Sequence, residues 1–197
     1  MIHLHATKKL FHRLPLDDSG QLAVTPRSQW LYERPLLDAN PLSGWHGNLV
    51  TLQRHQCVLL VHDTTRFPLV LPALTKPDFA ELNDRFADSL MNTLLKCGAD
   101  DAQMKAADKY LRPLQADTQS SRSELSTLNQ MKFETECFLA QDPVNIADMM
   151  GYQLGAWLAN MLRSVKGAPY IRPNEEMLNL LTGLANNKGS MEAANDD

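Results

Sequence analysis

The chain has 197 residues, of which 44% are hydrophobic and 21% charged, and its formal net charge is −4. These values are ordinary for a globular protein and exclude the strongly basic character of most nucleic-acid-binding domains. No apolar run approaches the roughly 20 residues that a membrane-spanning helix needs, so we expect no membrane segment. The opening MIHLHATKKL contains histidines and lysines where a secretory signal would be apolar, and we therefore expect a cytoplasmic protein.

The cysteines agree with a reducing compartment. Cys57, Cys97 and Cys137 are odd in number and show no CxxC spacing. This pattern favours buried free thiols over a disulfide framework or a zinc site.

Strand patterns come first along the chain. Residues 2–7 alternate apolar and polar side chains, which is the period of a strand with one buried face. Residues 48–53 and 56–62 are the best strand candidates, with Arg54 and His55 predicted to form a tight hairpin turn between them. The run CVLLV in the second of these strands lacks polar alternation, which is typical of a central strand covered on both faces.

An edge strand and a long helix are predicted next. Residues 67–74 predict a strand, and Pro68 and Pro72 place it at a sheet edge or keep it short, because proline cannot donate to the ladder. Apolar side chains at spacings of three and four then predict a helix over residues 77–97 that covers the sheet.

A shorter helix should follow the long one. Asp100 or Asp101 is expected to cap it, and it must end by Arg112 because Pro113 follows. Residues 115–119 fit either a brief strand or an extended connection, and the sequence leaves this choice open.

Two more helices are predicted in the second half. Ser121 with Glu124 fits a capping box that starts a helix to about Ala140. The next helix is expected to start at Asp142 and Pro143 and to carry two glycines one turn apart, Gly151 and Gly155. Glycine is unfavourable inside a helix, so this pair predicts a closely packed backbone, with another helix of the chain as the expected partner.

Together the elements predict a single α+β domain over residues 1–184. Its expected core is an antiparallel sheet of about four strands from residues 1–74, covered by about five helices from residues 77–184. The last of these helices should open at Pro173. Residues 185–197 are polar and acidic and predict a disordered tail.

Four sequence blocks resemble an uncharacterised bacterial family of the "domain of unknown function" kind. They are MIHLHATKKL, GWHGNLVTLQRHQCVLLVHDTTRFPL, SSRSELSTLNQMKF at residues 120–133, and YQLGAWLANMLRSVKG at residues 152–167. The likeness covers most of residues 1–181, and it implies no known activity.

The third block shows where this chain departs from the family pattern. The family form is N-R-S-V-L-G-S-M-N, onto which four residues map: Arg122, Ser123, Leu125 and Asn129. Ser126 and Thr127 stand in place of the family's glycine-serine pair. A tight backbone approach at this point is therefore not implied for this chain.

Several histidines raise the question of a metal site. The candidate ligands are His3, His5, His46, His55, His62 and Asp63, of which the first two would share one strand face. Their spacing matches no HExxH-type pattern, and ordinary hydrogen-bonded histidines are the favoured interpretation. We therefore expect no metal ion and no cofactor. No GxSxG elbow is present, and the sequence assigns no catalytic residue.

Residues from three segments form a candidate anion-binding or ligand-binding site. Thr7, Lys8 and Lys9 follow the first predicted strand, where hydroxyl and ammonium groups could hold a phosphate, with solvated lysines as the alternative. Trp45 and His46 lie in a Gly-Trp-His-Gly turn of the kind where ligands bind, with core anchoring of the indole as the alternative. The full candidate set is His5, Thr7, Lys8, Lys9, Trp45, His46, Arg122, Ser123 and Asn129. Helix capping and a surface ion pair are the alternative for its last three members.

Two functions remain open at this point. The first is a bacterial cytosolic binding or interaction module that uses the polar face of the N-terminal sheet to contact a protein partner. The second is a small enzyme for a phosphate-containing substrate, a nucleotide or RNA, with Lys8, Lys9 and Arg122 as anion contacts and His5 or His46 as acid-base group. Convergence of these five side chains would favour the enzyme.

Overall fold

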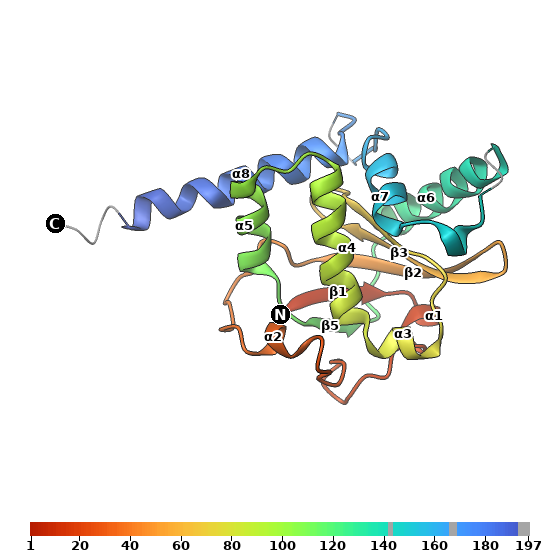
Figure 1. Ribbon diagram of the computed structural model, residues 1–197, viewed down its shortest axis with the longest axis horizontal. Helices are drawn as coiled ribbons and strands as arrows, with labels where there is room; N and C mark the ends of the chain where they lie inside the picture. The colour runs from red at the N-terminus through yellow and green to blue at the C-terminus, as the bar shows by residue number, and fades with distance from the viewer. Residues whose placement is uncertain (142–143, 166–168, 193–197) are drawn as a thin grey trace.

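The computed structural model describes residues 1–141, 144–165 and 169–192, and it confirms the α+β class (Figure 1). A five-stranded sheet with the order β4-β3-β2-β1-β5 lies at its centre. The strands are β1 (Ile2–Ala6), β2 (Trp45–Leu52), β3 (His55–His62), β4 (Pro68–Leu71) and β5 (Leu114–Asp117).

The sheet is mixed, which corrects the expectation of an antiparallel sheet from residues 1–74. β1 pairs in parallel with both β2 and β5, whereas β2, β3 and β4 pair antiparallel. Parallel neighbours need a long crossover, and residues 7–44 supply one between β1 and β2. β5 also settles the open choice at residues 115–119 in favour of a strand.

The hairpin and the edge strand were largely predictable. β2 and β3 are joined at Gln53 and Arg54, one residue earlier than expected, and His55 already belongs to β3. Both turn residues have positive φ, 44° and 71°, as a two-residue hairpin turn requires. β4, with Pro68 as its first residue, lies at the edge of the sheet as the prolines predicted.

The described residues contain eight α-helices, more than the five or so expected. They are α1 (Lys8–Phe11), α2 (Gln29–Tyr32), α3 (Lys76–Ala80), α4 (Leu82–Lys96), α5 (Asp101–Tyr110), α6 (Arg122–Gln141), α7 (Gly151–Ala159) and α8 (Pro173–Glu192). The helix predicted over residues 77–97 is divided into α3 and α4, because the backbone of Glu81 departs from helical geometry. None of the helices among the described residues could span a membrane.

Two boundaries in the C-terminal half differ from the prediction. The helix expected from Asp142 is instead a 3-10 turn, Ile146–Asp148, followed by α7, and Asp142 and Pro143 themselves lie outside the described residues. α8 continues to Glu192, beyond the end expected near residue 184, and it projects from the rest of the molecule (Figure 1). Residues 193–197 of the predicted tail lie outside the described residues.

Helices cover both faces of the sheet. Side chains of α1, α4 and α5 pack with those of β1 and β5 in one core, and side chains of α6 and α7 pack with those of β2, β3 and β4 in a second core on the opposite face. On that second face β1 and β5 carry polar side chains, because their apolar residues alternate toward the first core. A polar part of the sheet therefore lies beside α6.

The two glycines of α7 pack against backbone, as the sequence predicts. A Cβ at Gly151 would overlap the carbonyl oxygen of Val70 in β4, and one at Gly155 would lie 3.2 Å from the Thr93 side chain in α4. The partner of this helix is thus the edge strand as well as a helix.

Burial of His62 makes the stability of the fold depend on pH. His62 is fully buried against Trp45, with the ring centroids 5.1 Å apart, and burial lowers the pKa of His62 from 6.5 to about 4. The unfolded chain binds a proton near pH 6.5, whereas the folded chain binds it only near pH 4. This contribution to stability is therefore complete above pH 6.5 and is lost as the pH falls toward 4.

We expect His62→Gln to remove most of this pH dependence. Between pH 7 and pH 4 the wild type should lose about 3 kcal/mol of unfolding free energy more than the variant does. Urea denaturation at a series of pH values measures the difference. His12→Gln, at an exposed position, should keep the wild-type dependence. Equal pH profiles for wild type and His62→Gln would contradict the assignment.

Candidate functional site

Four polar side chains meet where β1, β2 and β5 run side by side. His5 lies opposite His46 in the β1–β2 register and opposite Asp117 in the β1–β5 register. Residues paired in this way point to the same face of a sheet. Asp63, the residue after β3, completes a group that we call the His–Asp cluster: His5, His46, Asp63 and Asp117.

Short hydrogen bonds join the residues of the cluster into two His–Asp pairs. His5 Nδ1 lies 2.8 Å from Asp117 Oδ1, and His46 Nδ1 lies 2.6 Å from Asp63 Oδ1. The two imidazole centroids are 4.9 Å apart, and His5 Nε2 lies 4.0 Å from Asp63 Oδ2. Asp63 therefore lies between the two histidines, and Asp117 contacts His5 on the side away from His46.

The start of α6 fixes the protonation of His46. The backbone N–H of Ser121 donates to His46 Nε2 at 3.1 Å, so this nitrogen carries no proton. His46 is then neutral, and its Nδ1–H donates to Asp63. His5 differs, because its Nε2 has no hydrogen-bond partner within the described part of the chain.

Exposure separates the members of the cluster. His46 is buried, with 5% of its surface exposed, whereas the side chains of His5, Asp63 and Asp117 are 19%, 30% and 34% exposed. A ligand can therefore reach His5 and both carboxylates. His46 is buried beneath them and positions Asp63 through its hydrogen bond.

Gly44 makes room for this arrangement. It has a φ of 87°, and a Cβ at this position would lie 3.0 Å from Asp63 Oδ2. Its carbonyl oxygen accepts a hydrogen bond from the Asp63 N–H at 2.9 Å. The glycine before Trp45 thus allows the chain to turn tightly against Asp63.

A buried ion pair holds the first turn of α6 beside the cluster. Arg66, in the turn before β4, pairs with Glu124 and donates to Ser123 Oγ at 3.0 Å. Burial alone would raise the pKa of Glu124, but hydrogen bonds from Ser121 and Arg66 outweigh it and lower this pKa. Ser123 therefore positions the helix, which is a different role from the ligand contact considered in the sequence.

Trp45 does not belong to the site. It is fully buried in the opposite face of the sheet, where its Nε1 donates to the Leu42 carbonyl at 2.8 Å and its ring packs edge-on against Phe86. Neighbouring residues of a strand point to opposite faces, so Trp45 and His46 cannot serve the same surface. Core anchoring, the alternative weighed in the sequence, is what the structure shows.

The remaining candidates lie around the cluster or away from it. Thr7 donates to Asn48 Oδ1 at 3.0 Å and is thereby tied to β2. The other four are exposed, and their side chains make no ion pair within the described residues: Lys8, Lys9, Arg122 and Asn129. Of the five side chains whose convergence would favour an enzyme, the structure brings His5 and His46 together.

A model of the DUF6933 family, described as a domain of unknown function, matches residues 3–176. The chain belongs to this family. The match confirms the resemblance drawn from the four sequence blocks, and it includes every residue of the His–Asp cluster. No curated protein and no solved structure matches the chain.

In this DUF6933 domain, sequence reasoning missed Asp117. The signal was present, because Leu114, Gln115, Ala116 and Asp117 alternate apolar and polar side chains as β1 does. Recognising β5 as a neighbour of β1 would have placed this carboxylate beside His5. Asp63 had been considered only as a metal ligand.

Of the histidines considered for a metal site, His5 and His46 lie together in the His–Asp cluster of the DUF6933 domain, and the other three lie away from it. His62 is buried toward the first core, His55 begins β3 at the hairpin, and His3 is exposed. Within residues 1–141, 144–165 and 169–192, no three His, Cys, Asp or Glu side chains are placed to hold a metal ion.

Proposed function

We propose that this DUF6933 domain is a bacterial cytosolic binding module that contacts a protein partner through the His–Asp cluster. The observation that supports this proposal is the convergence of two histidines and two carboxylates, as two adjacent hydrogen-bonded pairs, on an accessible part of the sheet. A rigid sheet surface that presents oriented polar groups is a common basis of recognition. The three free cysteines fit a reducing compartment.

The charge of the cluster indicates the chemistry of the partner. Neither Asp63 nor Asp117 pairs with a lysine or arginine among the described residues, and His46 is neutral. Two accessible carboxylates therefore favour a partner that presents a cationic side chain. Arginine fits best, because its planar guanidinium donates to carboxylates in pairs.

A small enzyme for phosphate-containing substrates is the second candidate. His5 Nδ1 is held by Asp117 while its Nε2 makes no hydrogen bond to any described residue, which is the arrangement of a general base oriented by a carboxylate. Arg122, directly after Ser121, could contact an anion from the edge. Asp63 and Asp117 oppose this function, because they would repel a phosphate at the centre of the cluster.

A peptide titration tests the module against the enzyme. We expect short arginine-containing peptides to bind the wild type at low salt and to bind more weakly as salt increases. Asp63→Asn and Asp117→Asn should each weaken this binding by about tenfold, since each removes a charge-assisted contact. Asp18→Asn, which removes an exposed carboxylate from a turn, is the matched control.

The same titration includes nucleotides and short RNAs. If these bind while the arginine peptides do not, and if a Lys8→Ala, Lys9→Ala, Arg122→Ala triple variant loses that binding, the enzyme replaces the module as the function to pursue. Arginine peptides that bind equally to wild type and both aspartate variants would also overturn the proposal.

A further inference from the structure

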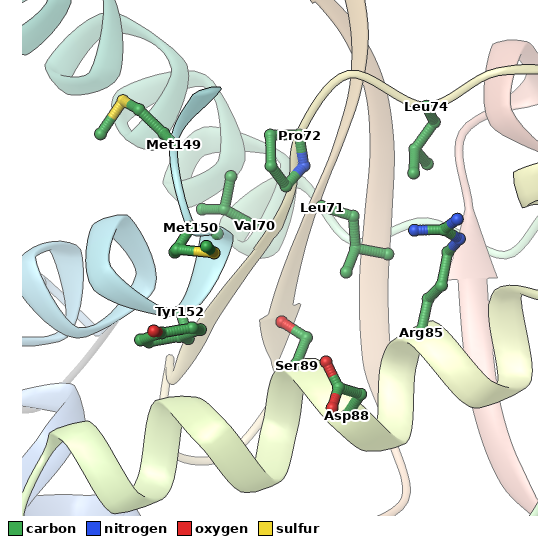
Figure 2. A pocket seen from close by; sticks show the side chains of 11 residues that line it. Val70, Leu71, Pro72, Leu74, Arg85, Asp88, Ser89, Met149, Met150 and Tyr152 are labelled. Atoms are coloured by element: carbon green, nitrogen blue, oxygen red, sulfur yellow. The ribbon is translucent and has the colours of Figure 1, made fainter. Parts of the chain in front are cut away.

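A second candidate site lies at the opposite edge of the sheet from β5. It is formed by the end of β4 together with α4 and α7. A cavity of about 230 Å³ lies there. Its apolar walls include Leu71, Met150 and Tyr152 (Figure 2). Drug-sized ligands occupy cavities of about 300–1,000 Å³, so this one suits a smaller molecule.

Two side chains that line this cavity carry a hydrogen-bond donor without a partner among the described residues, and one of them, Ser89, points into it. Ser89 is 6% exposed, and its Oγ points from α4 into the space toward Met150 (Figure 2). Arg85 pairs with Asp78 through one terminal nitrogen, but its Nε is buried and makes no hydrogen bond. Because buried polar groups are almost always satisfied in folded proteins, Ser89 Oγ indicates an acceptor that enters the cavity from outside the chain.

The N-terminus of α7 opens onto the same space. Gly151, the first residue of this nine-residue helix, lines the cavity, and Met150 before it provides no side-chain cap. Uncapped amides at a helix start attract a negatively charged acceptor. Together with Ser89 Oγ they form a set of donors suited to a carboxylate, and Arg85 adds a positive charge to the lining of the cavity.

One acceptor stands opposite these donors. The carboxylate of Asp88, next to Ser89 on α4, lines the same cavity and uses one oxygen to accept from the Asn92 amide. The two negative charges of Asp78 and Asp88 exceed the single positive charge of Arg85. This balance disfavours a ligand that carries negative charge alone. A cationic group beside the ligand's carboxylate would pair with Asp88 and balance the charges.

We propose that this cavity binds an α-amino acid with an apolar side chain. The carboxylate contacts Ser89 Oγ and the first amides of α7, and the ammonium group contacts Asp88. The side chain lies against Leu71, Met150 and Tyr152. This site is separate from the His–Asp cluster and does not depend on the function proposed for it.

Calorimetric titration of the full chain with matched ligands tests the proposal. L-Phenylalanine, L-leucine and L-methionine should bind, whereas 3-phenylpropanoate and 2-phenylethylamine, which each lack one charged group, should bind at least about tenfold more weakly than L-phenylalanine. Equal binding of 3-phenylpropanoate, or no binding of the three amino acids at millimolar concentration, would overturn the proposal.

Two variants locate the binding. Ser89→Ala and Asp88→Asn should each weaken L-phenylalanine binding by about tenfold while leaving the melting temperature unchanged, since neither side chain holds elements of the fold together. Asp101→Asn, which removes an exposed carboxylate from α5 away from the cavity, should bind as the wild type does. Undiminished binding by Ser89→Ala, in a variant that melts like the wild type, would refute the assigned site.

Discussion

Gly151→Ala is expected to lower the free energy of unfolding by about 3 kcal/mol, although it adds a single methyl group. The new Cβ would overlap the carbonyl oxygen of Val70 and lie 2.8 Å from Cδ of Pro72. Val70 belongs to β4, which is held by its pairing with β3, so the oxygen cannot move without displacing either the strand or α7. Urea denaturation of the variant measures the loss.

Gly183→Ala is the control for this substitution. Gly183 lies within α8 at an exposed position, and a Cβ there would meet no atom within 4 Å. Alanine should increase stability at this position by about 0.5–1 kcal/mol, since it favours the helix without a clash. Gly155→Leu should destabilise by about 1–3 kcal/mol through contact with Thr93. Unchanged stability of Gly151→Ala would mean that α7 does not pack on β4.

The second large effect is expected for Glu134→Ala. Arg163, whose side chain is 1% exposed, donates to both carboxylate oxygens of Glu134 at 2.7 Å. Removing the carboxylate leaves a guanidinium charge buried without a counter-charge, and this costs about 3–5 kcal/mol. The melting temperature and the free energy of unfolding should both decrease.

Glu136→Ala, on the same helix, separates this effect from the general cost of changing α6. Glu136 pairs with Lys132 one turn earlier, and its side chain is 46% exposed. Exposed pairs of this kind contribute less than about 1 kcal/mol, so the variant should remain close to the wild type. Comparable losses in Glu134→Ala and Glu136→Ala would show that burial of Arg163 is not the cause.

Local patterns explain which parts of the fold were predictable. Alternation in β1, the apolar run in β3 and the prolines around β4 each depend on neighbours in the sequence, and the sequence predicted all three. The parallel position of β1 was not predictable in this way. It depends on a crossover of residues 7–44 and on β5, which joins the sheet from much later in the chain.

The same distinction applies to the site. His5 and His46 were selected because they stand out on short strand-like segments, and the structure places them side by side. Their carboxylate partners come from the end of β3 and from β5, so only the sheet order shows that Asp63 and Asp117 are close to them. Trp45 was misassigned because its segment was interpreted as a turn, whereas it is the first residue of β2.

The position of β1 between β2 and β5 has a consequence for how the protein folds. The hydrogen bond between His5 and Asp117 joins residues 112 positions apart, and β1 must wait for β5 before its second edge is paired. Contacts of such long sequence separation form slowly, and until they form the unpaired edge of the strand is open to other chains. The His–Asp cluster therefore exists only after the last strand has docked. Recovery of peptide binding during refolding would accordingly lag behind recovery of the helical circular dichroism signal. The length of this delay would measure how long β5 takes to pair with β1.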